Sequence, residues 1–317
     1  MHQRVFGACL LLLVQYAAAS LAAQETPSSS PPPGESYRVY RPDGKIHGAL
    51  VLLPGFGGDP NSFDPASAST PSSLPARLTA HGILTVVTVP RSETLYETET
   101  PLRELDALLA RILQQYEVPR DRVSIGGFSA GGNGAVRYAQ FCAQQKCQAV
   151  PAIAAVFAVD PPLDLERLYR TSELSVQRNA PRSNIAEEDM ILQTLRRALG
   201  GTPDEVPGAY RFHSAVLASA PDGGNALLLG RTPIRLYTEP DVHWWMDERN
   251  LDYHAMNAVD HAALINLLRV AGNDRAELIT TTGKGYRPGG RRHPHSWSIV
   301  DEAQLERWLL TTLSPAV

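Results

Sequence analysis

Short, nearly continuous apolar runs alternate along the chain with segments of helical periodicity. Strands that are buried on both faces of a sheet read as continuous apolar runs, which is typical of parallel sheets. The sequence therefore predicts an α/β fold, with a mostly parallel central sheet and helices on both faces. The predicted strands span residues 37–40, 48–54, 83–90, 122–128, 152–160, 233–239 and 276–282.

Three segments carry apolar residues at helical spacing. The first spans residues 100–116, with Thr100 as a candidate cap and Pro101 in the first turn. The second spans residues 253–273 and is closed by a glycine near its end. The third begins near Asp301 and completes the alternation of strands and helices.

The alternation is interrupted by residues 162–232, where helical pieces are separated by glycine and proline breaks. This insert follows the predicted strand that ends at Asp160. Inserted segments at the carboxyl ends of sheet strands are well placed to cover a cleft, so we expect a lid, although the insert could instead cover a sheet face.

The first residues have the pattern of a secretory signal peptide. Arg4 precedes an apolar run from Val5 to Val14, and small residues follow, so we expect residues 1–22 to be removed on export to a secreted or periplasmic location. Ten apolar residues are too few for a stable membrane span. Residues 23–36 are rich in proline and serine and predict an extended tether before a single domain at 37–317.

Two cysteines remain after the predicted signal peptide. Cys142 and Cys147 are five residues apart, and an exported protein meets oxidising conditions. We expect them to form a disulfide, provided that the helix carrying Cys142 ends between them; the alternative is two buried free thiols.

The charge of the chain argues against nucleic acid as a partner. With 29 basic and 33 acidic residues, the formal net charge is −4, which offers no basic surface for a phosphate backbone. The sequence does not indicate the oligomeric state.

A serine stands between glycines at the end of one apolar run. The segment GFSAG at 127–131 follows a predicted strand and precedes a helix-compatible stretch. Glycines permit the tight strand-to-helix turn that exposes such a hydroxyl, and the N–H groups at the helix start favour negative charge on its oxygen. Ser129 is therefore a candidate nucleophile rather than only a small residue in a turn.

A nucleophilic serine also needs hydrogen-bond donors for the oxyanion that forms on the substrate. A glycine-rich turn, GFGG at 55–58, follows the strand at 48–54 and is expected at the same edge of the sheet as Ser129. We predict that the oxyanion hole consists of the backbone N–H groups of Phe56 and Ala130.

The proton of the serine must pass to a base. The polar loop 283–301 holds His293 and His295, and we choose His295 because Pro294 stiffens the chain before it, with His293 as the alternative. The two histidines could also form a metal pair, but no other histidine of the chain forms a recognisable ligand spacing with them.

A carboxylate must in turn orient the histidine. Asp241 follows the strand at 233–239 and lies between the serine and the histidine in chain order, so we choose it as the acid. Asp160 and Glu239, which also end predicted strands, are the alternatives.

Together, GFGG, GFSAG, a post-strand aspartate and the late HSW resemble an α/β-hydrolase over about residues 37–315. HSW also resembles the sequence around the catalytic histidine of related hydrolases. Within the superfamily, the segment PRDRVSIGGFSAGG resembles the nucleophile elbow, the strand-to-helix turn that carries the serine, of secreted esterases of the polyhydroxyalkanoate-depolymerase and feruloyl-esterase kind.

The resemblance implies a serine esterase that acts without a cofactor or metal on a small-molecule or polymeric ester. Ser129 would attack the ester carbonyl, His295 would relay the proton and Asp241 would orient the histidine. A peptidase or amidase with the same triad, and a catalytically inactive exported binding protein, are the alternatives.

Overall fold

The computed structural model describes residues 36–91, 95–178 and 182–313. The predicted signal peptide at 1–22 lies outside the described residues, as does the predicted tether except for Ser36. Within the described ranges, no helix is both long enough and apolar enough to cross a membrane.

Within the described residues, seven strands form one sheet in the order β1-β3-β2-β4-β5-β6-β7. β1 pairs with β3 in the antiparallel direction, and all other neighbouring strands are parallel, so the predicted mostly parallel sheet is confirmed. The strands are β1 Ser36–Tyr40, β2 Gly48–Leu53, β3 Ile83–Val89, β4 Val123–Phe128, β5 Ala155–Val159, β6 Ile234–Thr238 and β7 Ala276–Thr280.

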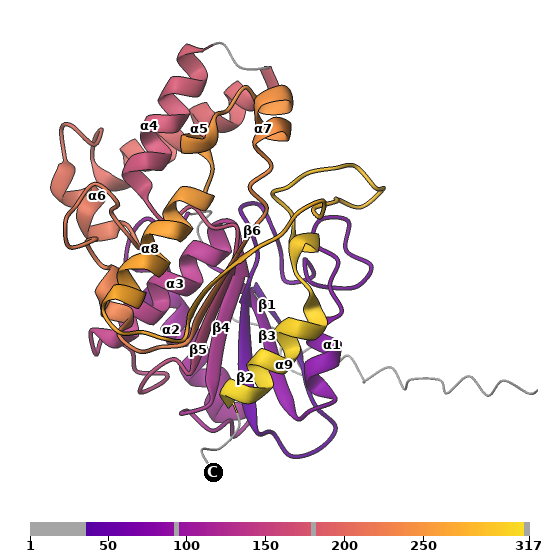
Figure 1. Ribbon diagram of the computed structural model, residues 1–317. Helices are drawn as coiled ribbons and strands as arrows, with labels where there is room; N and C mark the ends of the chain where they lie inside the picture. Colours follow the sequence, from indigo (N-terminus) through magenta and orange to yellow (C-terminus); the bar gives the residue numbers. More distant parts are fainter. Residues whose placement is uncertain (1–35, 92–94, 179–181, 314–317) are drawn as a thin grey trace, which may run out of the picture.

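Helices cover both faces of the sheet. Figure 1 shows α2, α3 and α8 on one side and α1 and α9 on the other. Every residue of β2 is buried, as expected for a strand with an apolar cluster on each side. These helices are α1 Leu74–Thr79, α2 Thr100–Gln115, α3 Ala130–Ala143, α8 Ala258–Val270 and α9 Glu302–Leu313.

The insert at 162–232 is largely helical and has a small apolar core of its own. Leu165, Tyr169 and Leu195 pack together in this core, and Ala130 at the start of α3 belongs to the same cluster. Figure 1 shows α4 and α5, with α7, beyond one end of the sheet. The elements are α4 Leu165–Gln177, α5 Arg182–Leu199, α6 Pro207–His213, the 3₁₀ helix η1 Ala226–Leu229 and, after the insert, α7 Val242–Arg249.

The sequence-based helix boundaries need two corrections. Glu99, rather than Thr100, is the N-cap residue of α2. The helix predicted over 253–273 is divided, with a 3₁₀ helix at Tyr253–Ala255 (η2) and α8 from Ala258. The carboxylate of Asp252 accepts a hydrogen bond from the His254 N–H, which favours a separate short turn there. A further 3₁₀ helix, η3, spans Trp297–Ile299.

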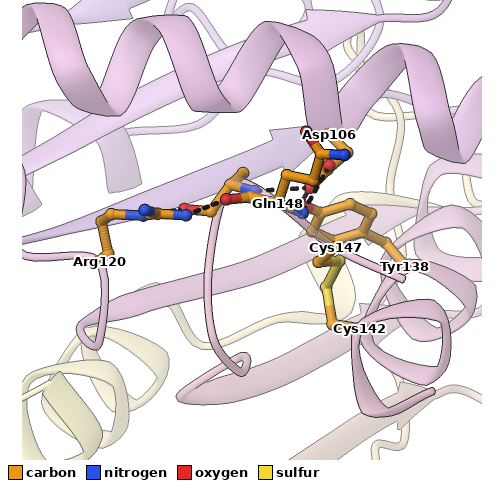
Figure 2. Close-up of a disulfide and its surroundings, with 7 residues drawn as sticks. Asp106, Arg120, Tyr138, Cys142, Cys147 and Gln148 are labelled. Carbon is orange, nitrogen blue, oxygen red and sulfur yellow. Dashed lines mark hydrogen bonds between the residues drawn. A yellow bond between two sulfur atoms is a disulfide. The ribbon is translucent and has the colours of Figure 1, made fainter. Parts of the chain in front are cut away.

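The predicted disulfide between Cys142 and Cys147 is present, with the two Cα atoms 4.7 Å apart. It forms because α3 ends at Ala143, so the chain can turn back between the two cysteines. Beside it, the buried Asp106 carboxylate accepts hydrogen bonds from the Tyr138 hydroxyl and from the Gln148 N–H, both at 2.8 Å (Figure 2). The disulfide thus fastens the loop after α3 to α3 itself, and Asp106 fastens the same loop to α2.

Candidate active site

Ser129 occupies a sharp turn between β4 and α3. Its backbone has φ 54° and ψ −124°, a conformation that a residue with a side chain rarely adopts. The glycines around it are required by close packing, since a Cβ on Gly131 would run into the carbonyl oxygens of Leu53 and Pro54. The turn exposes the serine side chain at the carboxyl end of the sheet, while α3 begins directly behind it.

Ser129 lies in hydrogen-bond contact with a histidine that is 166 residues further along the chain. Its Oγ is 3.0 Å from Nε2 of His295, which accepts the hydroxyl proton when that nitrogen is unprotonated. The His295 ring also packs against Phe128, with the ring centroids 4.9 Å apart. Hydroxyl and imidazole are therefore placed for proton transfer.

The other ring nitrogen of His295 contacts Asp160. Its Nδ1 lies 2.7 Å from Oδ2 of Asp160, which fixes the tautomer with the proton on Nδ1. Asp160 directly follows β5 and has φ 47°, and its second oxygen accepts a hydrogen bond from the Thr238 hydroxyl at 3.0 Å. Ser129, His295 and Asp160 thus form a continuous hydrogen-bonded series.

The environment of Asp160 favours the ionised carboxylate. Burial raises the pKa of this carboxyl, but the hydrogen bond and charge of His295, followed by His261 and the Thr238 hydroxyl, outweigh that effect and lower the pKa below its ordinary value. A carboxylate that stays ionised can stabilise a positive charge on His295.

The neighbour of His295 is Asp160 and not Asp241, which corrects our first choice of acid. Asp241 caps α7 by accepting a hydrogen bond from the Trp244 N–H at 3.1 Å, and its other oxygen is 2.7 Å from the Arg292 guanidinium. β5 lies between β4 and β6, so the end of β5 is the nearer one to Ser129.

Glu239, the other alternative acid, is also occupied elsewhere. Its side chain is buried, and it accepts hydrogen bonds from the Lys284 N–H at 2.9 Å and from the Arg292 guanidinium at 2.7 Å. Arg292 therefore ties the loop that carries His295 to the segment after β6.

His293 lies beside the site without contacting Ser129 in the structure. Only 3 % of its surface is exposed, and the Trp244 ring packs on it with the centroids 4.7 Å apart. Its Nε2 is 3.0 Å from the guanidinium of Arg249, which is always a donor, so Nε2 is the acceptor. Burial, followed by the charges of Arg287 and His295, lowers its pKa to about 3. His293 is therefore neutral at ordinary pH.

The glycine-rich loop after β2 closely approaches the Ser129 turn. A Cβ on Gly55 would lie 3.1 Å from the Phe128 ring and 3.3 Å from Cβ of Ser129. Phe56 lines the same cavity as Ser129, and Ala130 is the first residue of α3. Phe56 and Ala130 thus both lie beside the cavity that holds the serine.

A cavity of about 300 Å³ opens beside Ser129 and His295. Leu168 of α4, Ile191 of α5 and Trp245 of α7 contribute apolar wall, and Arg249 and Arg287 contribute positive charge. The cavity is therefore formed by the sheet edge, the insert and the loop of His295 together.

A network that the sequence did not reveal holds the Asp160 segment in place. The Asn257 amide donates to the Asp160 carbonyl oxygen at 2.9 Å and accepts from the Arg167 guanidinium at 3.0 Å. Arg167 also pairs with Asp260, which is fully buried and accepts from the Leu163 N–H at 3.0 Å. These residues match no motif, and the local signal was limited to one acidic residue, Asp260, within a largely apolar helical segment.

Within the described ranges, no group of three or more histidine, cysteine, aspartate or glutamate side chains has a geometry that could hold a metal ion.

No protein-family model and no curated protein sequence matches the chain. The chain does, however, match solved structures. An esterase of the bacterial hormone-sensitive lipase family has a TM-score of 0.56 at 18% identity, with 89% of this chain and 82% of that chain covered. An S-formylglutathione hydrolase from Agrobacterium tumefaciens has a TM-score of 0.51 at 15% identity, with 88% and 90% covered.

An acylaminoacyl peptidase from Pyrococcus horikoshii has a TM-score of 0.51 at 13% identity; the match covers 88% of this chain but only 38% of the peptidase. At these identities the likeness is one of fold. The α/β-hydrolase fold expected from the sequence is therefore confirmed.

Proposed function

We propose that this α/β-hydrolase fold carries a serine hydrolase that cleaves carboxylic esters, with Ser129 as nucleophile, His295 as base and Asp160 as the orienting acid. The observation that supports it most is the continuous series of contacts from Ser129 Oγ through both nitrogens of His295 to the Asp160 carboxylate, beside a cavity. This is the arrangement by which a weak hydroxyl nucleophile is activated.

In the proposed reaction, Ser129 Oγ attacks the ester carbonyl carbon while its proton moves to Nε2 of His295. The oxyanion accepts hydrogen bonds from the N–H groups of Phe56 and Ala130, which form no other hydrogen bond within the described residues. The tetrahedral intermediate collapses to an acyl-enzyme as His295 gives its proton to the departing alkoxide. Water, deprotonated by His295, then releases the acid.

The insert at 162–232 would serve as the roof of the substrate cavity in this reaction. Leu168 and Thr171 of α4 and Ile191 of α5 line the cavity, which supports the expectation of a lid. With a signal peptide at 1–22 and the disulfide, the enzyme would act on small-molecule or polymeric esters outside the cytoplasm. The narrower relation to polyhydroxyalkanoate depolymerases and feruloyl esterases rests on the elbow sequence alone.

Labelling with a fluorophosphonate tests the proposal, because this reagent bonds covalently to an activated serine. We expect the wild-type protein to take one label and to cleave p-nitrophenyl esters, and both properties to be lost in Ser129→Ala and strongly reduced in His295→Ala. His293→Ala is the control for the choice of base. A folded wild-type protein that takes no label would instead support an inactive binding protein.

A peptidase or amidase is the second candidate, because one of the fold's neighbours is described as an acylaminoacyl peptidase. Comparing kcat/KM for a p-nitrophenyl ester and a peptide anilide separates the two. We expect the ester to be the better substrate; a preference for the anilide would replace the esterase assignment and leave the triad in place.

A further inference from the structure

The loop that carries His295 also carries an arginine that has no carboxylate partner among the described residues. Arg287 lines the same cavity as Ser129 and His295. Its side chain is half-buried, and within the described ranges no hydrogen bond or ion pair joins its guanidinium to a carboxylate. A partly buried cation without a partner is costly to maintain, so its position calls for an explanation.

The backbone of this loop holds Arg287 in place. The Arg287 N–H donates to the Arg291 carbonyl oxygen at 2.9 Å, and the Gly290 N–H donates to the Arg287 carbonyl oxygen at 3.0 Å, which closes a tight turn. Arg292 ends the turn and is bound to Glu239 and Asp241. The direction of the loop is therefore set by contacts that do not involve the Arg287 side chain.

The other arginine that lines the cavity, Arg249, already has partners. The Arg249 guanidinium is 3.3 Å from the Glu187 carboxylate and 3.0 Å from Nε2 of His293. Glu188 also lines the cavity, and burial raises the pKa of its carboxyl above the ordinary value. Among the cavity residues that the structure describes, Arg287 is thus the arginine that is left to interact with a ligand.

We propose that Arg287 binds a carboxylate of the substrate, so that the preferred esters carry an anionic group in addition to the bond that is cleaved. A guanidinium presents paired N–H donors that match the two oxygens of a carboxylate. The inference rests on the proposed ester hydrolysis and narrows its substrate class.

The electrostatic surroundings of Arg287 agree with this assignment. Burial, followed by the like charges of Arg249 and Arg291, lowers the pKa of its guanidinium, while Glu187 acts in the opposite direction. A bound carboxylate would offset the repulsion among these arginines. The apolar wall from α4, α5 and α7 would accommodate the carbon chain of the same substrate.

Two matched pairs of esters test the proposal, each measured by titration of the acid released. Monomethyl adipate against methyl hexanoate places the carboxylate on the acyl side, and butanoyl glycolate against ethyl butanoate places it on the alcohol side. We expect the wild-type protein to prefer the anionic member of one pair. The ratio of kcat/KM, anionic over neutral, should fall about tenfold in Arg287→Gln, mainly through KM, and recover in part in Arg287→Lys.

Arg291→Gln is the matched control, because it removes the same charge from an exposed position of the same loop. An equal fall of the ratio in both variants would indicate a general charge effect and overturn the inference. Ester cleavage without preference for an anionic substrate, or with a ratio unchanged in Arg287→Gln, would also overturn it but leave the proposed function standing. A wild-type protein with neither ester cleavage nor fluorophosphonate labelling would overturn both.

Discussion

At the scale of single residues, the partner of His295 Nδ1 determines which ring nitrogen can accept the serine proton. Asp160 fixes the proton on Nδ1 and so leaves Nε2 as the acceptor facing Ser129 Oγ. Thr238 and Asn257 hold the Asp160 side chain and backbone, respectively. The second oxygen of Asp160 is therefore satisfied without competing for His295.

The two aspartates allow a direct comparison. We expect Asp160→Asn to lower kcat on a p-nitrophenyl ester on the order of a thousandfold, because the amide would favour the wrong tautomer of His295. Asp241→Asn should change kcat by less than about tenfold and cost about 1 kcal/mol of stability, because it weakens the cap of α7 and the contact with Arg292. The reverse order of the two kcat values would restore Asp241 as the acid.

At the scale of elements, the strands were predicted closely and the short helices poorly. Each predicted strand overlaps one observed strand. The signal was clearest for β2 and β5, because burial on both faces leaves continuous apolar runs. α7, in contrast, has no buried residue and shows no apolar periodicity over Val242–Arg249, so its only signal was Asp241 as a capping residue. From the sequence, we assigned the same aspartate to the triad instead.

The turn between β4 and α3 depends on the absence of a side chain at Gly131. We expect Gly131→Ala to destabilise the protein by about 1–3 kcal/mol and to reduce fluorophosphonate labelling, because the new methyl group would push the turn away from Leu53 and Pro54. Gly44→Ala, where a Cβ would have nothing within 4 Å, is the control. Urea unfolding and labelling should distinguish the variants; equal behaviour would contradict the packing argument.

At the scale of the whole molecule, the site is assembled from segments that are far apart in the chain. Ser129 and His295 had local signals, a glycine-flanked serine after a strand and a histidine in a late loop. The choice between Asp160 and Asp241 depended on which strand lies next to β4, and strand order is not written in any local pattern. The contacts of Arg167, Asn257 and Asp260 likewise arise only when the chain is folded.

His293 makes the free energy of unfolding depend on pH. Its pKa is lowered from 6.5 to about 3, so the unfolded chain binds the proton first and the free energy of unfolding falls as the pH drops from 6.5 towards 3. Between pH 7.5 and pH 5, we expect His293→Gln to lose about 1–2 kcal/mol less stability than the wild type, as measured by urea unfolding. The exposed His254→Gln is the control, and a loss in His293→Gln as large as the wild type's would refute the argument.

The position of Asp160 relative to the insert has a mechanical consequence. Asp160 directly follows β5, and the insert starts two residues later, so the carboxylate and the cavity roof are carried by one short stretch of chain. Arg167 and Asp260 clamp the beginning of the insert to α8. If the proposed function holds, exchanging helices beyond this clamp would therefore alter substrate choice and leave the contacts of Ser129, His295 and Asp160 intact, whereas shortening the chain before the clamp would disturb both at once.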